Sequence, residues 1–159
     1  MPVQVNIRHL KEKEAHLRGE LPVAELDLEN KDELIHARRP LRYELTAQKI
    51  GGAILARGRL ELTLDCECAR CLKPFAHRIL LEQWTAHLPL EGPEKTPVKE
   101  DMADLTPYLR EDILLEFPQH PLCGADCAGL PNRAKESKTK GGRPAEDSSA
   151  WSALNRLKF

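Results

Sequence analysis

The five cysteines are the residues of this chain whose spacing is best suited to chemistry. Cys68 and Cys71 are separated by two residues, so one tight turn can present both thiolates to a single metal ion. Cys123 and Cys127 are separated by three residues, so a second turn can do the same. Four thiolates around one ion make a closed tetrahedral site, which is the usual arrangement of a structural zinc site. We therefore expect these four cysteines to bind Zn²⁺.

Other interpretations of the cysteines stay open at this level. The two pairs are separated by 51 residues, 72–122, which is a longer interval than in compact zinc motifs. Cys66 lies two residues before Cys68 and is a reserve ligand, as is His120. The thiols could instead be buried without a function, or Cys66, Cys68 or Cys71 could form a disulfide in a redox switch. An odd number of cysteines excludes a complete set of disulfides within one chain.

The hydrophobic pattern predicts antiparallel strands that would position the first cysteine pair. Strand-like segments are found at residues 2–10, 41–48, 59–65 and 75–88. The first three alternate apolar with polar residues, which is typical of half-buried strands, and Gly51-Gly52 favours a tight turn between the second and third. The fourth is rich in apolar residues and would return after the cysteines, with a helix as its alternative. Residues 11–20 fit either a helical turn or a loop.

A helix predicted over residues 106–117 would position the second cysteine pair. Thr106 is expected to cap it, and Pro107 fits the first helical position. Apolar residues that recur every four positions form one face, namely Leu105, Leu109, Ile113 and Phe117. Pro118 is expected to end the helix shortly before His120 and the second pair.

These elements predict an α+β fold. We expect a mainly antiparallel sheet of about four to six strands, one packed helix, a cysteine cluster and a short C-terminal helix. Residues 1–130 would form the core domain, 131–148 a basic disordered linker, and 149–159 a short docking helix. In that helix Trp151, Leu154 and Leu157 share one face. A helix of this length is not stable alone in water, so it would dock on the core domain or on a partner.

The charge of the chain is unevenly distributed. The whole chain has 24 basic and 25 acidic residues. Residues 128–159 hold seven basic and three acidic residues, or +4, which leaves 17 against 22, or −5, for residues 1–127. The basic tail could neutralise RNA phosphates through Arg133, Lys135, Lys138, Lys140 and Arg143. A solvated linker explains these charges as well. A second basic group, formed by Arg38, Arg39 and Arg42, is either a smaller patch or a solvated strand end.

Several classes of protein fit the sequence poorly. The first residues lack the basic start and continuous apolar core of a signal peptide, and no window approaches the roughly 18 apolar residues of a membrane span. We therefore expect a cytoplasmic protein. Gly51-Gly52 is not followed by the Lys-Ser/Thr of a phosphate-binding loop, and none of the six scattered histidines forms a convincing dyad with a cysteine. We expect no enzymatic activity.

The first cysteine pair resembles the C-x-R-C-x-x-P-F signature of the bacterial YceD family, also called the large ribosomal RNA subunit accumulation family. The matching residues are Cys68, Arg70, Cys71, Pro74 and Phe75. Later segments are similar to further family landmarks, namely the helix at 104–117, the second cysteine cluster at 121–130 and the closing segment at 151–158. Many members continue Gly-Leu-Cys-Pro-x-Cys-Gly, whereas this chain reads Gly-Leu-Pro-Asn-Arg at 129–133 and lacks that cysteine pair.

The resemblance implies a non-enzymatic function in the accumulation of large-subunit ribosomal RNA. The implied partner is this RNA or a pre-ribosomal particle, and no catalytic residue is implied. Either a metal uses the four cysteines named above, with Cys66 in reserve, and acts as a stabiliser, or this chain binds no metal. Two alternatives remain, a thiol redox-responsive protein and a protein-interaction adaptor that uses the terminal helix.

Overall fold

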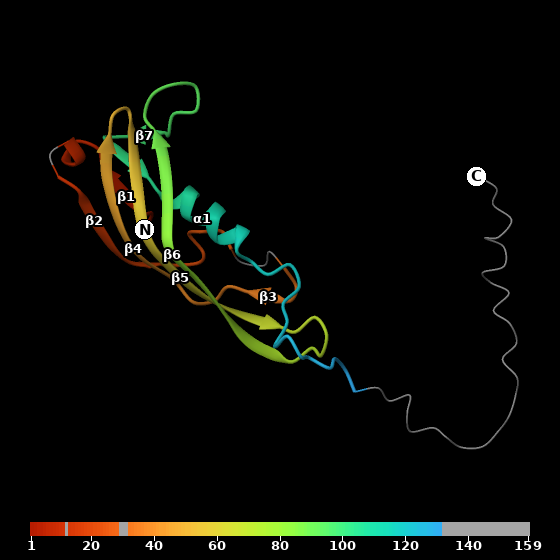
Figure 1. Ribbon diagram of the computed structural model, residues 1–159. Helices are drawn as coiled ribbons and strands as arrows, with labels where there is room; N and C mark the ends of the chain where they lie inside the picture. The colour runs from red at the N-terminus through yellow and green to blue at the C-terminus, as the bar shows by residue number, and fades with distance from the viewer. Residues whose placement is uncertain (12, 29–31, 132–159) are drawn as a thin grey trace, which may run out of the picture.

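The computed structural model describes residues 1–11, 13–28 and 32–131, and their fold is α+β and mostly antiparallel sheet, as predicted (Figure 1). The strands are β1 (Gln4–Asn6), β2 (Ala15–Leu21), β3 (Ile35–His36), β4 (Leu41–Ile50), β5 (Ala53–Glu67), β6 (Pro74–Pro89), β7 (Val98–Lys99) and β8 (Met102–Asp104). A 3₁₀ helix, η1 (His9–Lys11), follows β1, and the α-helix α1 (Thr106–Leu115) follows β8. No helix in the described part of the chain is long and apolar enough to cross a membrane.

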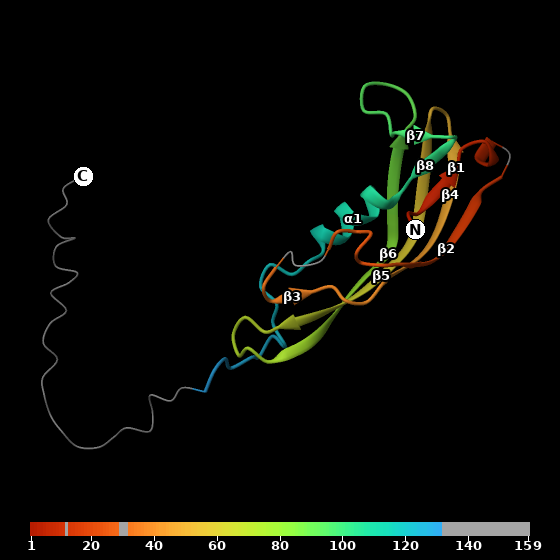
Figure 2. The ribbon, with the colours of Figure 1, turned by 180° about the vertical axis from the view of Figure 1, so that it is seen from behind.

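Five strands form the main sheet, with β5 at its centre. β6 pairs with β5 along the whole length of β5, whereas β4 pairs only with residues 53–61. β2 extends the sheet beyond β4, and the short β3 pairs with β5 at Asp65 and Cys66. The outer part of the β5–β6 hairpin, residues 62–79, therefore projects away from β2 and β4 and is accompanied only by the short β3 among the described strands (Figures 1 and 2). We call this segment the arm.

The arm leaves the sheet at an irregularity in the β5–β6 pairing. Gly58 faces Trp84, but Leu60 faces Leu81, so β6 contains an extra residue at this point. Such a bulge bends a strand and increases its twist. Gly58 also allows a close approach to β4, because a Cβ atom there would lie 2.1 Å from the carbonyl oxygen of Glu44. The bend and the glycine together explain how the same β5–β6 hairpin belongs to the main sheet at one end and forms the arm at the other.

A smaller antiparallel sheet, ordered β1-β8-β7, accompanies α1. The start of α1 is tied to this sheet because the backbone N–H of Val3 donates to Oγ1 of Thr106 at 2.9 Å. On the other side, Nε1 of Trp84 in β6 donates to the Asp112 carboxylate of α1 at 2.5 Å. The helix is thus fixed to both sheets, as its position in Figure 2 shows.

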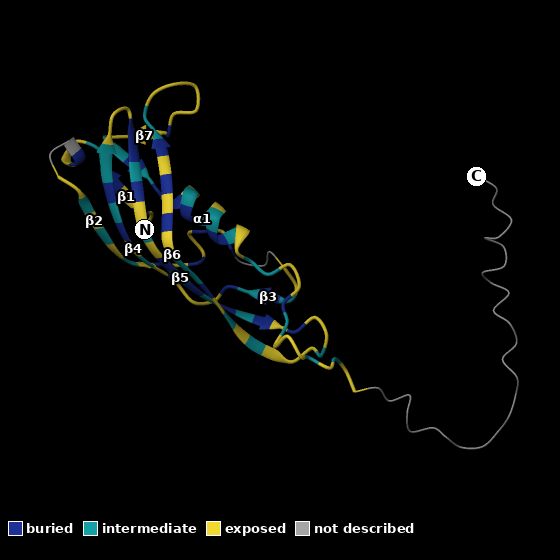
Figure 3. Ribbon diagram, viewed as in Figure 1, coloured by how far each residue is buried: buried dark blue, intermediate teal, exposed yellow. Residues whose placement is uncertain are grey.

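One hydrophobic core joins the main sheet, α1 and β1. The alternation of buried and exposed residues along the long strands is visible in Figure 3. From the helix, Leu105, Leu109 and Ile113 are fully buried, which confirms three positions of the predicted apolar face. The fully buried leucines of β4, β5 and β6 are Leu41, Leu45, Leu60, Leu62, Leu64 and Leu88. Burial of each such side chain stabilises the fold by about 1.5–3 kcal/mol.

Some predicted element boundaries were wrong. Leu105, not Thr106, precedes the first helical turn, and no side chain caps it, because the Thr106 hydroxyl accepts a hydrogen bond from the backbone N–H of Val3 instead. The helix ends at Leu115, two residues before the predicted end. The strand predicted over 2–10 shrinks to β1 and is followed by η1. Residues 15–21 form strand β2, where only a turn or loop was expected, because pairing with β4 decides their conformation.

The strands expected over 41–48, 59–65 and 75–88 are confirmed as β4, β5 and β6, and Gly51-Gly52 forms the turn between β4 and β5. The second sheet was not predicted. The predicted disordered linker at 131–148, apart from its first residue, and the predicted docking helix at 149–159 lie outside the described residues. These boundaries stay predictions.

Candidate metal centre

The turn between β5 and β6 presents the first cysteine pair at the end of the arm. The backbone N–H of Cys68 donates to the carbonyl oxygen of Lys73 at 3.0 Å, and that of Leu72 donates to the carbonyl oxygen of Cys68 at 2.8 Å. Leu72 has φ +60°, the left-handed conformation that closes such a turn. The turn therefore brings Cys71 back over Cys68. The Cys68 side chain is fully buried, and Cys71 is half-buried.

The second pair lies on an irregular segment that follows α1 and runs back to the arm. The backbone N–H of Ala69 donates to the carbonyl oxygen of Pro121 at 2.8 Å. Nη1 of Arg70 lies 3.5 Å from the carbonyl oxygen of Cys127, to which it donates. These two bonds hold the segment against the turn. The motif arginine between the first two cysteines thus helps to position the second pair, a contact that the spacing alone did not reveal.

The four sulfur atoms form a compact group. All of them lie within 4.8 Å of one another. The Cys68 and Cys127 sulfurs are 3.7 Å apart, and those of Cys71 and Cys123 are 3.6 Å apart. In a tetrahedral zinc site with Zn–S distances of about 2.3 Å, neighbouring sulfurs lie about 3.8 Å apart. The arrangement therefore fits a four-thiolate metal ion, with each turn supplying two ligands.

The environment divides the thiols into two kinds. Backbone hydrogen bonds from Cys123 and Cys71 lower the pKa of Cys68 to about 6. Hydrogen bonds with the sulfurs of Cys71, Cys127 and Cys68 raise the pKa of Cys123 to about 12. Near neutral pH and without a metal, Cys68 is therefore mainly a thiolate, whereas Cys123 keeps its proton. A metal ion must displace the proton of Cys123 before all four sulfurs can bind it.

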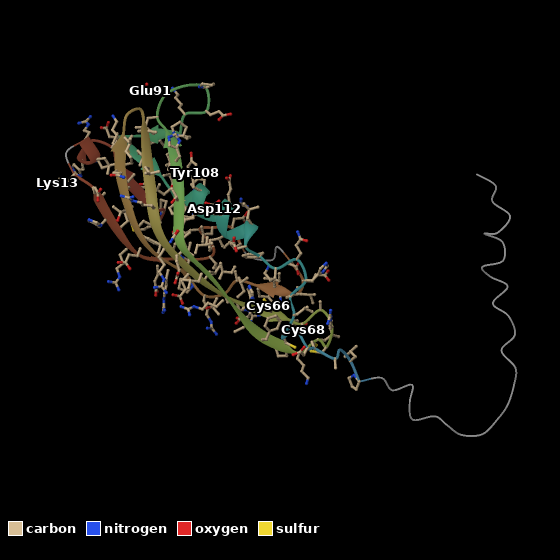
Figure 4. All side chains as sticks on the ribbon, in the orientation of Figure 1. Lys13, Cys66, Cys68, Glu91, Tyr108 and Asp112 are labelled. Carbon is tan, nitrogen blue, oxygen red and sulfur yellow. The ribbon has the colours of Figure 1, made fainter. Side chains whose placement is uncertain are left out.

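The two reserve ligands lie outside this group of four. Cys66 faces the hydrophobic core, with 2% of its surface exposed, and it pairs with Ile35 and Phe75 in the sheet. Burial, with smaller contributions from the charges of Asp65 and Asp32, raises the pKa of the Cys66 thiol. His120 is exposed. Figure 4 shows Cys66 on the arm and Cys68 at its end.

The predicted basic sites have different outcomes. The five tail residues proposed to contact RNA, Arg133, Lys135, Lys138, Lys140 and Arg143, lie outside the described residues. In the second basic group, Arg42 pairs with Glu20 at 3.0 Å, and Arg39 lies 3.8 Å from Asp65. Carboxylates therefore already neutralise two of its three arginines, which favours the interpretation of a solvated strand end.

A cavity of about 610 Å³ lies beside α1 and is lined in part by Tyr108. Figure 4 shows Tyr108 well separated from Cys66 and Cys68. The hydroxyl groups of Tyr108 and Thr96 form a 2.8 Å hydrogen bond at its wall. The rest of its polar lining combines Lys99 with acidic and amide side chains, and includes no cysteine or histidine. The cavity therefore takes no part in the thiol chemistry.

Comparison with known proteins gives one match. The family described as "Large ribosomal RNA subunit accumulation protein YceD" matches residues 56–158, which include all four cysteines of the group and the arm. No curated protein and no solved structure matches the chain.

Proposed function

Because the chain belongs to the YceD family of large ribosomal RNA subunit accumulation proteins, we propose that it supports accumulation of large-subunit ribosomal RNA and assembly of the ribosome. The proposed activity is binding, not catalysis, and its partner is the RNA itself or a pre-ribosomal particle. The protein would then work in the cytoplasm, where bacterial ribosomes are assembled. The observation that carries the proposal is the family match over most of the chain.

Within this function, we assign Cys68, Cys71, Cys123 and Cys127 to a structural zinc ion. The sulfur spacing fits a tetrahedral site, and four thiolates leave no position open for a water or substrate. When bound, the ion would supply a crosslink between the β5–β6 turn and the segment after α1. Two hydrogen bonds, from Ala69 and Arg70, otherwise connect these parts at the cysteines.

The basic tail is the proposed electrostatic contact with RNA. Its net charge of +4 contrasts with −5 for residues 1–127, so a polyanion is attracted to one end of the chain and repelled by the rest. Binding through lysine and arginine to phosphates would be strongly weakened by salt and largely independent of RNA sequence.

A redox response through disulfide formation is the second candidate function, and the short sulfur–sulfur distances support it. Sulfurs 3.6 and 3.7 Å apart in the pairs Cys71–Cys123 and Cys68–Cys127 need only a small movement to form disulfides. Each bond would transfer two electrons to an oxidant such as hydrogen peroxide, which takes up the two thiol protons and leaves as water. Zinc content separates the candidates, because near-stoichiometric zinc that resists mild peroxide argues against a switch.

The proposed function is tested in cells that lack this protein. We expect the ratio of large-subunit to small-subunit ribosomal RNA to fall, and the wild-type chain to restore it. The variant C123S/C127S, expressed at the same level, should restore it less well, whereas D126S in the same segment should act as wild type. An unchanged RNA ratio in the deletion strain would refute the proposed function.

A further inference from the structure

We propose that the end of the arm is a contact surface for single-stranded RNA. This surface, which we call the tip surface, consists of Arg70, Leu72, Lys73 and Leu130. The inference rests on the proposed function and assigns its RNA contact to named residues of the described structure. It adds a folded surface to the basic tail, which the sequence alone indicated.

The tip surface combines apolar and basic side chains in the open. Leu72 is 55% exposed and Leu130 is 60% exposed. Arg70 and Lys73 are also exposed. A Cβ atom at Gly129 would lie 3.7 Å from the carbonyl oxygen of Arg70, so the chain around Leu130 runs directly beside the turn. The four residues therefore lie on two segments that meet beside the cysteine group.

The two cations of the tip surface form no ion pair within the described residues, whereas several cations of the sheet do. Within the described residues, no carboxylate forms an ion pair with Arg70 or Lys73. On the outer face of the main sheet, Arg42 pairs with Glu20 at 3.0 Å, and Arg78 pairs with Glu61 at 2.8 Å. A phosphate at Arg42 or Arg78 must displace these carboxylates, but a phosphate at Arg70 or Lys73 displaces none. What distinguishes the tip surface is that its cations lie beside exposed apolar side chains.

The backbone of Leu72 adds an independent observation. A left-handed conformation costs a residue with a Cβ about 1–2 kcal/mol, and Leu72 gains little from burial in return. Strained positions of this kind cluster at active sites, ligand clamps and switch regions. Here the strained residue has an apolar side chain that is 55% exposed, between Arg70 and Lys73 in the sequence.

The chemistry of this surface fits single-stranded RNA better than a duplex. Unstacked bases offer apolar faces to a leucine and to an arginine guanidinium, and the phosphates between them attract the cations. In a duplex the base faces are stacked, so Leu72 would have nothing to contact. In the sequence, the five cations at 133–143 follow Leu130 closely.

The test measures RNA binding by the full-length, zinc-loaded chain, using fluorescence anisotropy. The probes are a labelled single-stranded RNA of about 12 nucleotides and a hairpin of the same composition. We expect the single strand to bind more tightly. The variant R70A/K73A should weaken its binding about tenfold and reduce the slope of log affinity against log salt by about 1.4, since each phosphate contact on a single strand contributes about 0.7.

A matched control separates this surface from charge in general. Arg18 and Arg57 are exposed on the outer face of the sheet and have no ion pair within the described residues. R18A/R57A removes the same net charge, and we expect its affinity to stay within about twofold of wild type. Zinc content and circular dichroism establish that each variant is folded.

The outcomes distinguish the two proposals. If the full-length chain binds neither RNA, direct RNA binding is wrong and this inference falls with it. A different result would overturn the inference alone: R70A/K73A binds like wild type, while a full-length variant with the five tail cations changed to glutamine loses the RNA. A photo-crosslinker placed at Leu72 that captures a protein, and no RNA, in cells would also overturn it.

Discussion

Removal of the second ligand pair tests whether a metal crosslink stabilises this fold. The variant C123S/C127S keeps the size of each side chain nearly constant and changes an exposed and a half-buried residue, so packing losses are small. Its expected effect on the free energy of unfolding follows from the length of the loop that the metal crosslink would close. Cys68 and Cys127 are 59 positions apart, and a crosslink over about 59 residues removes about 4 kcal/mol of chain entropy from the unfolded state.

The free energy of unfolding should therefore fall by about 4 kcal/mol in zinc-saturated buffer. With a urea dependence of about 2 kcal/mol per molar, the midpoint of unfolding would move down by about 2 M. Wild-type protein treated with a strong chelator should shift by a similar amount, and the variant should not respond to the chelator at all. D126S serves as the control, because Asp126 is exposed in the same segment.

One result would refute the reasoning. If zinc-loaded and chelator-treated wild-type protein unfold at the same urea concentration, the four sulfurs do not crosslink the fold through a metal. A wild-type chain purified with less than one metal ion per chain would lead to the same conclusion.

Three further predictions concern other positions. G58A should lower the free energy of unfolding by about 3 kcal/mol or more, because the new Cβ would lie 2.1 Å from the carbonyl oxygen of Glu44; G124A, with nothing within 4 Å, should be close to neutral in the same urea titration. L72G should keep or raise stability by up to about 1 kcal/mol, yet weaken RNA binding in the anisotropy assay; a loss of about 2 kcal/mol or more would show that the side chain packs in the fold. Because the raised pKa of Cys123, about 12, keeps its proton in place at neutral pH, zinc binding must release that proton, so affinity should rise by about tenfold per pH unit from this proton alone. Competition with a coloured chelator between pH 7 and pH 9 measures the slope of log zinc affinity against pH. This slope should be smaller by one in C123S.

Much of the main sheet could be predicted from the sequence, because its signal is local. Alternation of apolar and polar residues along a strand follows from the geometry of the strand itself, and β4 and β5 confirm it. The turn at Gly51-Gly52 was also predictable, since glycine allows a conformation that other residues resist. The helix followed from its repeat, although its ends did not, because the Thr106 hydroxyl oxygen accepts a hydrogen bond from the backbone N–H of Val3 and does not cap the helix.

The sequence alone determined that two cysteine pairs have ligand spacing, and that the charge of the tail opposes that of the remaining chain. Spacing within each pair is a local property, so it can be read from neighbouring residues. Only the tertiary structure decided that the pairs meet and that Cys66 faces the core and not the group of four. It also decided that, among the residues it describes, Arg42 has an ion pair while Arg70 and Lys73 have none. These outcomes depend on which face of β5 each side chain takes and on where the chain returns after α1. Those choices are made by packing and strand pairing between residues far apart in the chain, which no local pattern encodes.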